Sequence, residues 1–448
     1  MNYDSAVRYL LSLGRELAAP TQAPAAKFDL ENIVVLADRL GRPDRAYPSV
    51  HIAGTNGKGS TAAFLESILR RAGFRTGLYT SPHLERINER IRINGQEISD
   101  GAFAEVFSRV QTLIEELLAQ GRLRAHPTFF ECVTALAFEA FAQAGVEFAI
   151  FEVGLGGRLD ATNLLGPAAC VITQIEFDHE NFLGHSLREI ASEKAGILKP
   201  ATPVVIAPQH AEALEVILAR AKDLGAPVIE AQKQFRVENV SSKEDGYVRA
   251  DVADLSTGKP LRIAPSLAGQ FQLQNALSAT AAARLLQTRG FRIADADIEE
   301  GIASVEWPGR LERLASRPDV YLDGAHNPAA ARAVAEFLRR NFAGRKVRLV
   351  FGALRDKAVD EVAGILFPHA AEVVFTEPRT SRAISAPRLA EIAGHHAERF
   401  SVIPSAEEAL DQVLAQATPV DAIFVTGSLY LVGQLRHHWK MRAKAAVR

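Results

Sequence analysis

Hydrophobic and polar positions follow two patterns along the chain. Short runs rich in β-branched and apolar residues predict strands, and longer stretches with apolar residues every three to four positions predict amphipathic helices. In the first half of the chain the predicted strands are 49–53, 76–79, 148–153, 169–175 and 203–206, and the predicted helices are 62–72, 103–119 and 130–144. Their alternation is typical of an α/β fold with a mostly parallel sheet covered by helices on both faces.

Other segments depart from this alternation. A short hairpin is predicted at 90–98, where Asn94 and Gly95 form the turn. Several short strands are predicted within 235–263, and a helix follows at 273–288.

Pro308 and Gly309 lie together in a stretch without periodicity, which is typical of a turn between domains. Beyond it, strands are predicted at 320–322, 347–351, 372–375, 400–403 and 422–426. We therefore expect a first α/β domain at 1–302, a linker at 303–311 and a smaller, Rossmann-like α/β domain at 312–448. The cleft between two such domains is the expected place for an active site.

The composition excludes several classes of protein. The chain has 448 residues, 48% of them hydrophobic, so it can bury a large core. Its formal net charge of -2, without a long basic run, argues against nucleic acid as a partner. Only Cys132 and Cys170 are cysteines, and no apolar run reaches the ~18 residues of a membrane span. We expect a soluble cytoplasmic monomer that acts on small molecules, away from membranes.

A glycine-rich loop connects the first predicted strand to its helix. It consists of Gly54, Thr55, Asn56, Gly57, Lys58, Gly59 and Ser60. Such a loop turns backbone N–H groups inward at a helix N-terminus, and Lys58 adds a full positive charge, so the loop predicts ATP binding. The usual P-loop has Ser or Thr after the lysine, where this chain has Gly59. This departure indicates a distinct subfamily, and a plain turn with a solvated lysine is the alternative.

Polar residues near the ends of predicted strands provide candidate metal ligands. Glu152 ends one strand, and Asp178 and His179 follow the next one. Because the carboxyl ends of parallel strands meet at one edge, these groups could form a Mg²⁺ site, to which Ser81 could add a hydroxyl. Turn capping by Glu152 and Ser81, and hydrogen bonding by His179, are the alternatives. A dinucleotide fingerprint is not favoured, because its last glycine would fall on Leu159.

Other candidates lie on helices and after later strands. Lys194 lies on a predicted helix, where a solvated lysine paired with a glutamate of that helix is the alternative. In the second domain, Asp323 and His326 follow a strand and precede a helix, and Ser428 is placed similarly. Ordinary helix capping is the alternative for these residues. Arg310 in the linker could reach phosphates from either domain.

The ordered motifs resemble those of folylpolyglutamate synthase and dihydrofolate synthase, of the Mur ligase superfamily. The segments that carry this resemblance are 51–60, 80–83, 152–163, 178–179, 192–196, 271–275 and 323–328. The resemblance extends over 28–431. It implies a P-loop domain followed by a glutamate-ligase domain, and an ATP-dependent reaction in which a folate carboxylate becomes an acyl phosphate that the amine of L-glutamate displaces.

The same resemblance implies a role for each candidate. ATP would be bound by the loop 54–60, Asn275, Arg310 and Asp323. Magnesium would be bound by Ser81, Glu152 and His179. Lys194 matches a lysine that is carbamylated in the family, and it would act in catalysis with Lys58 and His326. Glutamate would be bound by His326 and Ser428.

A further set of residues resembles the pteroate pocket of bifunctional bacterial members. It comprises Phe28, Leu30, Thr128, Phe130 and Asp160. With this pocket the enzyme would accept dihydropteroate as well as a folate, and Asp160 would bind the amino-pyrimidine edge of the pterin. Phe130 is equally well explained as a core residue.

Three other functions stay open at this point. The enzyme could be a folylpolyglutamate synthase without the dihydropteroate activity. It could be another Mur-type amino-acid ligase, such as a cell-wall peptide synthetase, although no added sugar-nucleotide domain is evident. From another class, it could be an ATP-binding switch protein, which would need neither the second domain nor Lys194.

Overall fold

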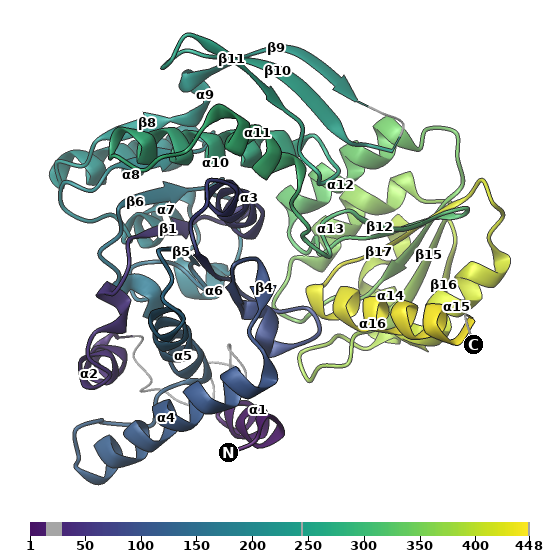
Figure 1. The fold of residues 1–448 in the computed structure, drawn as a ribbon. Coiled ribbons are helices and arrows are strands. Elements are labelled where there is room, and N and C mark those ends of the chain that lie inside the picture. Colours follow the sequence, from purple (N-terminus) through teal and green to yellow (C-terminus); the bar gives the residue numbers. More distant parts are fainter. Residues whose placement is uncertain (15–28, 243–244, 447–448) are drawn as a thin grey trace.

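Three β-sheets organise the computed structural model, which describes residues 1–14, 29–242 and 245–446 (Figure 1). The largest sheet has the order β4-β3-β2-β5-β1-β6-β7-β8. Its strands are β1 (Ser49–Ala53), β2 (Thr76–Tyr79), β3 (Ile91–Ile93), β4 (Gln96–Glu97), β5 (Phe148–Glu152), β6 (Ala169–Ile172), β7 (Val204–Ile206) and β8 (Val228–Glu230). All neighbours from β2 to β8 pair in parallel, and β3 and β4 extend one edge antiparallel. The predicted mostly parallel sheet is confirmed.

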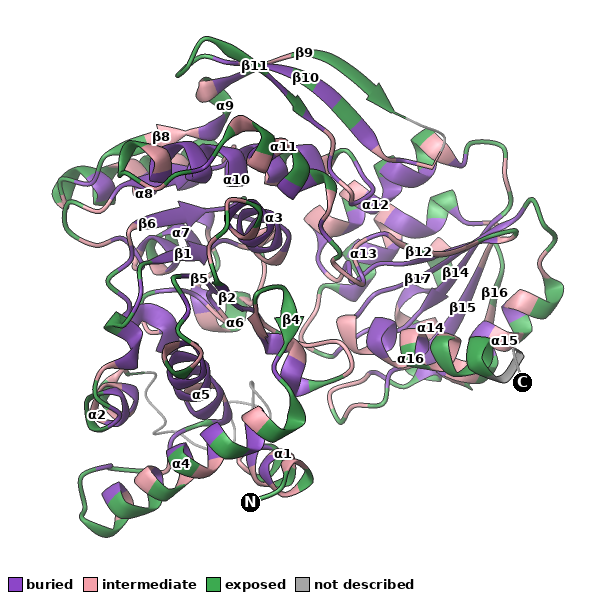
Figure 2. Cartoon of the chain, in the orientation of Figure 1, coloured by how far each residue is buried: buried purple, intermediate pink, exposed green. Residues whose placement is uncertain are grey.

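Helices cover both faces of this sheet. One face is covered by α3 (Lys58–Arg71), α10 (Phe271–Thr288) and α11 (Asp295–Ala303), and the other by α5 (Phe129–Gln143), α7 (Leu187–Ala195) and α8 (Ala211–Asp223). Ile150 packs on the first side and Phe151 on the second, so β5 is buried along its whole length (Figure 2). This explains why the strand reads as a continuous apolar run rather than an alternating one.

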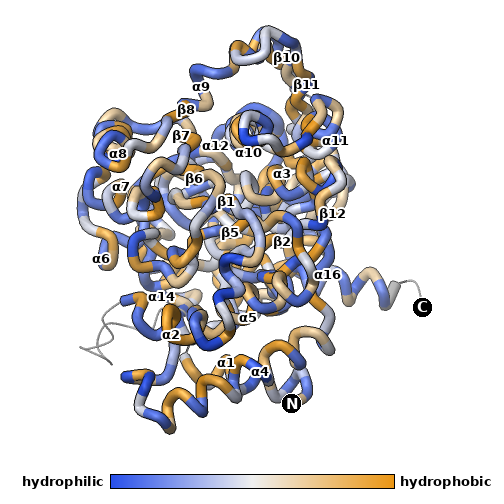
Figure 3. Tube along the Cα trace, turned by 60° about the vertical axis from the view of Figure 1, so that its left-hand side comes forward, coloured by the Kyte–Doolittle hydropathy of each residue, from blue (hydrophilic) through white to orange (hydrophobic). Residues whose placement is uncertain are grey.

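This region contains further helices. They are α1 (Tyr3–Ser12), α2 (Glu31–Arg39), α4 (Asp100–Ala119), α6 (Glu180–Leu183) and α9 (Ala231–Gln234), with short 3₁₀ helices η1 (Pro43–Arg45), η2 (Ile87–Arg90) and η3 (Ala161–Leu164). Along α1 and α4 hydrophobic and hydrophilic positions alternate, as expected for helices with one face in contact with the core (Figure 3). None of the helices within the described ranges is long and apolar enough to cross a membrane.

A small antiparallel sheet lies beside α10. It has the order β11-β10-β9, with β9 (Phe235–Ser242), β10 (Val248–Asp254) and β11 (Lys259–Ile263). Its β10 residues alternate between buried and exposed positions, and the buried ones join the core around α10. Asp254 at the end of β10 accepts a hydrogen bond of 2.7 Å from Arg284 of α10, which fixes the sheet to the helix.

The third sheet forms the second α/β region. Its order is β12-β13-β17-β14-β15-β16, with β12 (Glu312–Ser316), β13 (Asp319–Leu322), β14 (Val347–Phe351), β15 (Glu372–Glu377), β16 (Phe400–Ser405) and β17 (Ala422–Thr426). All pairs are parallel except β12 with β13. One face is covered by α12 (Pro328–Asn341), α13 (Val359–Leu366) and α14 (Ala386–Ala393), and the other by α15 (Ala406–Gln416) and α16 (Leu429–Ala446).

Some predicted boundaries are wrong for physical reasons. The strand predicted at 169–175 ends at Ile172, because Thr173 and the residues after it leave the sheet to contact the glycine-rich loop. Helix α3 begins at Lys58, four residues earlier than predicted, because the loop leads directly into the helix. Strands β8 and β12 were not predicted from the sequence. Residues 304–311 connect α11 to β12, and the predicted domain bounds stay a prediction.

One glycine controls the packing of α11 on α3. A Cβ on Gly301 would lie 2.6 Å from the Cα of Ile68, so the two helix backbones meet at this position. We expect Gly301→Ala to lower the free energy of unfolding by about 1–3 kcal/mol, because the helices must separate. Gly101→Ala in α4 is the control, because a Cβ there has no atom within 4 Å. Urea unfolding followed by circular dichroism checks this, and equal losses in both variants would contradict the backbone contact.

Candidate active site

A cavity of about 450 Å³ lies between the two α/β regions. The first region contributes the glycine-rich loop and residues after β2, β5 and β6, and the second contributes residues after β13. The predicted residues that line it are the loop 54–60, Ser81, Glu152, His179, Lys194, Asn275, Arg310, Asp323 and His326. The structure therefore brings most of the candidate site together from distant parts of the sequence.

The backbone of the loop is in close contact with two other elements. Gly54 has φ +147°, and a Cβ there would lie 1.9 Å from Oγ1 of Thr173, which follows β6. Gly57 has φ +85°, and a Cβ there would lie 2.2 Å from Oδ1 of Asn275 on α10. Both glycines are required by backbone conformation and by close approach. Their missing side chains explain how Thr173 and Asn275 can lie against the loop.

The lysine of the loop is held over the loop backbone. Nζ of Lys58 donates to the carbonyls of Gly54 and Thr55, each at 3.1 Å. Burial lowers the pKa of Lys58, and the nearby carboxylates of Glu152 and Asp178 oppose this shift. The ammonium group is therefore positioned at the loop by backbone carbonyls and by acidic neighbours.

The glycine after the lysine has a clear reason in the structure. A Cβ on Gly59 would lie 3.2 Å from Nε1 of Trp307 and 3.4 Å from Oε2 of Glu152. Trp307 belongs to the predicted linker, and Arg92 lies over its ring at 5.0 Å. The unusual glycine thus gives space for the linker to pack on the loop. Sequence reasoning missed Trp307, although a large aromatic residue beside Pro308 was visible.

Three predicted metal ligands have donor atoms suited to a divalent cation. The carboxylate of Glu152 is buried and accepts a hydrogen bond from the Ser81 N–H at 3.2 Å. Burial raises the pKa of Glu152, and Lys58 opposes this shift. His179 has φ +52°, and burial lowers its pKa to about 3, so its ring is neutral. Its buried Nδ1 has no hydrogen-bond partner among the described residues. A hydroxyl, a carboxylate and a neutral imidazole in one cavity fit a divalent metal.

Lys194 is not a solvated helix lysine. Its side chain is only 5% exposed, and Nζ donates to the carbonyl of Gly54 at 2.8 Å. Burial, with a smaller effect from Lys58, lowers the pKa of Lys194 to about 7. The two glutamates considered as partners bind elsewhere, since Glu193 pairs with Arg158 and Glu189 with Ser186. The alternative of a surface ion pair is therefore wrong.

The second region contributes an acidic and a basic group. The carboxylate of Asp323 accepts hydrogen bonds from the N–H groups of Leu311 and Ala325, at 2.9 and 2.8 Å, and burial raises its pKa. Nε2 of His326 lies 3.5 Å from Oδ2 of Asp178, so the two regions meet across the cavity. Burial alone would raise the pKa of Asp178, but the contact with His326 and the charge of Lys357 hold it well below its usual range.

Lys357 and Asn327 contact residues that line the cavity, and sequence reasoning missed both. Nζ of Lys357 lies 2.6 Å from Oδ1 of Asp178 and 3.4 Å from Nε2 of His179, with 6% of the side chain exposed. Nδ2 of Asn327 donates to Oδ1 of Asn56 at 3.0 Å. Both follow strands of the third sheet, β14 and β13, and this position after a strand was the signal available in the sequence. They add contacts between the two regions.

Two predicted site residues have side chains occupied by other contacts. The Ser428 hydroxyl accepts hydrogen bonds from the N–H groups of Tyr430 and Leu431 at the start of α16, which is the helix-capping alternative. The Asp160 carboxylate is buried and accepts four hydrogen bonds, from the N–H groups of Gly154, Leu155 and Thr162 and from the Thr162 hydroxyl. A ligand at either side chain would have to replace one of these donors.

Three of the other predicted pteroate residues, Leu30, Thr128 and Phe130, are not among the residues that line the cavity. Phe130 contacts Gly154, which lines the cavity: a Cβ on Gly154 would lie 2.5 Å from its ring. Thr128 caps α5 and is exposed, and Leu30 lies half-buried at the start of α2. Phe28 lies outside the described residues. Their binding role stays a prediction.

Comparisons with known proteins show the family of this chain. The Mur ligase middle domain matches residues 52–283, and the Mur ligase glutamate ligase domain matches residues 309–429. The dihydrofolate synthase/folylpolyglutamate synthase of Bacillus subtilis (strain 168) is 36% identical over 407 residues, which cover 90% of this chain and 93% of that protein.

Solved structures give the same result. Mycobacterium tuberculosis folylpolyglutamate synthase, complexed with ADP and AMPPCP, has a TM-score of 0.88 and 34% identity, covering 98% of this chain and 99% of that chain. E. coli FolC, in complex with DHPP and ADP, has a TM-score of 0.85 and 30% identity, covering 99% of each chain. The resemblance of the sequence motifs is thus confirmed, and this chain belongs to the folylpolyglutamate synthase/dihydrofolate synthase family of Mur ligases.

Proposed function

We propose that this protein is an ATP-dependent ligase that adds L-glutamate to folates and also to dihydropteroate, forming ADP. The observation that carries the proposal is the cavity in which the Lys58 loop of one region faces Asp323 and His326 of the other. The relative from Bacillus subtilis is named for both activities, which supports the second substrate. The bounds 1–302, 303–311 and 312–448 are the proposed domains.

The chemistry requires two steps in this cavity. A carboxylate oxygen of the folate attacks the γ-phosphate of ATP, so that ADP leaves and an acyl phosphate forms. The amine of glutamate then attacks the carbonyl carbon, and inorganic phosphate leaves. Both steps bring anions together, so the positive charges of Lys58 and Arg310 lower the barrier by binding the phosphate oxygens. Asn275 and Asp323 would bind the adenine and ribose.

A magnesium ion fits the donor set of Ser81, Glu152 and His179. When bound there, Mg²⁺ would neutralise charge on the phosphate oxygens. The buried Glu152 carboxylate and the unpaired Nδ1 of His179 support this assignment.

The amine step requires a proton acceptor and a binding site for glutamate. We assign His326 as the proton acceptor, because it lines the cavity and its Nε2 lies 3.5 Å from the Asp178 carboxylate, which orients the ring. Lys357 is a buried cation in the same group and suits a glutamate carboxylate. For Ser428 to bind glutamate, its hydroxyl must exchange the hydrogen bond from the N–H of Tyr430 for one to the substrate.

A substrate matrix tests the proposed function. ATP and L-glutamate are offered with dihydropteroate, tetrahydrofolate or a folate monoglutamate, and the products are weighed by mass spectrometry. We expect one added glutamate on dihydropteroate and on the reduced folates. If tetrahydrofolate is extended and dihydropteroate is not, the protein is a folylpolyglutamate synthase without the dihydropteroate activity. Phosphate release that needs neither folate nor glutamate would support an ATP-binding switch and overturn the ligase.

The loop lysine gives the next prediction. Lys58→Ala removes the full positive charge at the phosphates, so we expect turnover to fall by about 10²-fold or more while the fold is kept. Lys233→Ala is the control, because Lys233 is an exposed lysine paired with Glu230. Steady-state kinetics and circular dichroism provide the measurement. Near-normal turnover of Lys58→Ala would refute the assignment of the loop to ATP.

Lys194 gives a prediction about chemical modification. With a pKa of about 7, a growing fraction of Lys194 is the neutral amine as pH rises from 6 to 8, and this form adds CO₂ to give a carbamate and a proton. We expect a carbamate signal by ¹³C NMR with labelled bicarbonate, which is stronger at pH 8 than at pH 6 and absent in Lys194→Arg.

We also expect turnover to depend on Lys194. We expect Lys194→Ala to be inactive and to recover partly when a small carboxylate such as acetate is added. Full activity of Lys194→Arg would show that the carbamate is not needed, because arginine stays protonated.

A further inference from the structure

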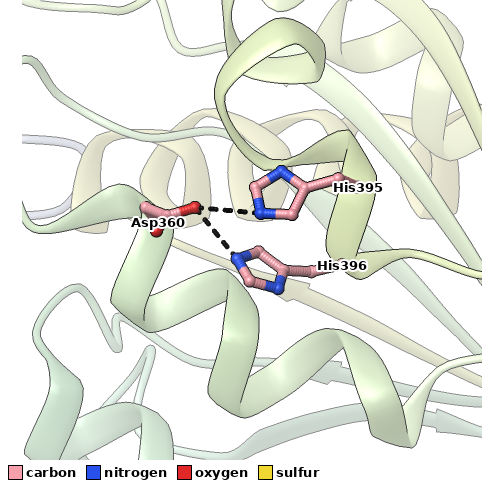
Figure 4. A group of neighbouring side chains, drawn as sticks. All are labelled: Asp360, His395 and His396. Carbon is pink, nitrogen blue, oxygen red and sulfur yellow. Dashed lines mark hydrogen bonds and ion pairs between the residues drawn. The ribbon is translucent and has the colours of Figure 1, made fainter.

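Two histidines and one aspartate converge on the surface of the second region, away from the cavity (Figure 4). Asp360 is the second residue of α13, and His395 and His396 end the 3₁₀ helix η5 (Gly394–His396) that follows α14. Nε2 of His396 lies 2.9 Å from Oδ1 of Asp360, and Nε2 of His395 lies 3.5 Å from the same oxygen. The three ligand atoms all lie within 4.8 Å of one another.

These atoms have the type and spacing of a transition-metal site. Zn²⁺ bound at about 2.0–2.2 Å by tetrahedral ligands separates those ligands by about 3.4 Å. Two imidazole nitrogens and one carboxylate suit Zn²⁺, whereas Mg²⁺ prefers oxygen ligands. This donor set therefore differs from the one assigned to the ligase reaction.

The two histidine rings lie together, and the His396 ring packs on α13. The two ring centroids are 3.9 Å apart, although adjacent residues usually point in different directions. The His396 ring lies against Gly364, one turn along α13 from Asp360, where a Cβ would come 3.2 Å from Cε1. Because both rings already face the carboxylate, little reorganisation is needed to bind a cation.

We propose that Asp360, His395 and His396 bind one Zn²⁺ ion, with the fourth position open to water. The ion joins the start of α13 to the end of η5, two segments that are about 35 residues apart in the sequence. Helix α13 begins two residues after Lys357, which contacts Asp178 in the cavity. The ion therefore stabilises the helix that follows a loop of the active site.

Zinc titration of the full chain without a polyhistidine tag tests this proposal. Calorimetry with zinc chloride is done with Mg²⁺ and ADP present, for the wild type, Asp360→Asn, His396→Gln and the control His369→Gln, an exposed histidine outside the group. We expect one bound Zn²⁺ and a raised Tm in wild type and control, and an affinity about tenfold lower or worse in the other two variants. Equal binding in all four proteins, or none in the wild type, would overturn the site.

A separate observation concerns Arg436 on α16, which joins two loops of the active site. Its Nη1 donates to Oε1 of Glu85 at 2.7 Å, and its Nε donates to both oxygens of Glu312 at 2.8 and 3.0 Å. Glu85 follows the Ser81 loop of the first region, and Glu312 follows the linker. One guanidinium group thus bridges two carboxylates that belong to different parts of the site.

Each carboxylate lies close along the chain to a residue that lines the cavity, since Glu85 follows Ser81 and Glu312 follows Arg310. Oε2 of Glu312 accepts a hydrogen bond from the N–H of Gly309 at 2.9 Å, directly before Arg310. On the other side, α16 packs on the Ser81 loop, because a Cβ on Gly433 would lie 2.1 Å from the carbonyl oxygen of Leu84. Burial alone would raise the pKa of Glu85, but hydrogen bonds from Lys440 and Arg436 lower it.

We infer that Arg436 is a positioning residue. It holds the segments 81–85 and 309–312, which contain Ser81 and Arg310, in fixed positions relative to the second region. The inference rests on the proposed ligase function. Arginine suits this role because its planar fork can donate to two carboxylates at once, whereas lysine has a single charged nitrogen.

Kinetics of Arg436 variants test this inference. Relative to wild type, we expect Arg436→Gln to lower kcat about tenfold or more with a smaller change in the KM for ATP, and Arg436→Lys to recover part of the loss. Arg388→Gln is the control, because Arg388 forms an exposed pair with Glu391 on α14. In a double-mutant cycle, Glu85→Gln should add little to the loss in Arg436→Gln.

Two outcomes separate the inference from the function on which it rests. A wild-type protein without ligase activity would refute the proposed function itself. An active wild type whose Arg436→Gln variant has normal kcat, or loses activity only in proportion to its unfolded fraction, would overturn the positioning role.

Discussion

Close contact with one glycine-rich loop is the constraint on which the site depends. Thr173 after β6 and Asn275 on α10 occupy the space that side chains at Gly54 and Gly57 would need. The linker does the same at Gly59. Since each glycine admits a different element, the first sheet, α10 and the linker all take their positions from one stretch of backbone. Phosphate-binding N–H groups are thereby placed where both regions meet.

Charge balance is the second requirement, because the cavity buries ions of both signs. Burial disfavours the charged form of each group, and a nearby opposite charge offsets that cost. Asp178 contacts His326 and Lys357, so its pKa stays low although loss of solvent would raise it. Lys194 instead contacts the carbonyl of Gly54, which carries no full charge, and its pKa falls to about 7. Partners, more than depth of burial, therefore decide which groups stay ionised.

Much of the fold could be predicted because local patterns and architecture agree. Continuous apolar runs such as β5 indicate strands covered by helices on both faces. Pro308 and Gly309 interrupt the pattern where the first α/β region ends and the second begins. The errors occur where a contact between distant residues overrides the local pattern. The strand at 169–175 is cut short at Ile172 because the residues after it contact the glycine-rich loop.

The site was less predictable than the fold. Several polar residues follow a strand and precede a helix, and the sequence does not show which of them accepts hydrogen bonds from the first N–H groups of that helix. Ser428 supplies the acceptor for the first N–H groups of α16, so its hydroxyl is used. In the corresponding place before α12, Asn327 takes that role, and His326 just before it faces the cavity. Lys357 likewise precedes the cap of α13. A residue one position before a helix cap is therefore better placed for chemistry than the cap itself, because the helix leaves its polar atoms free.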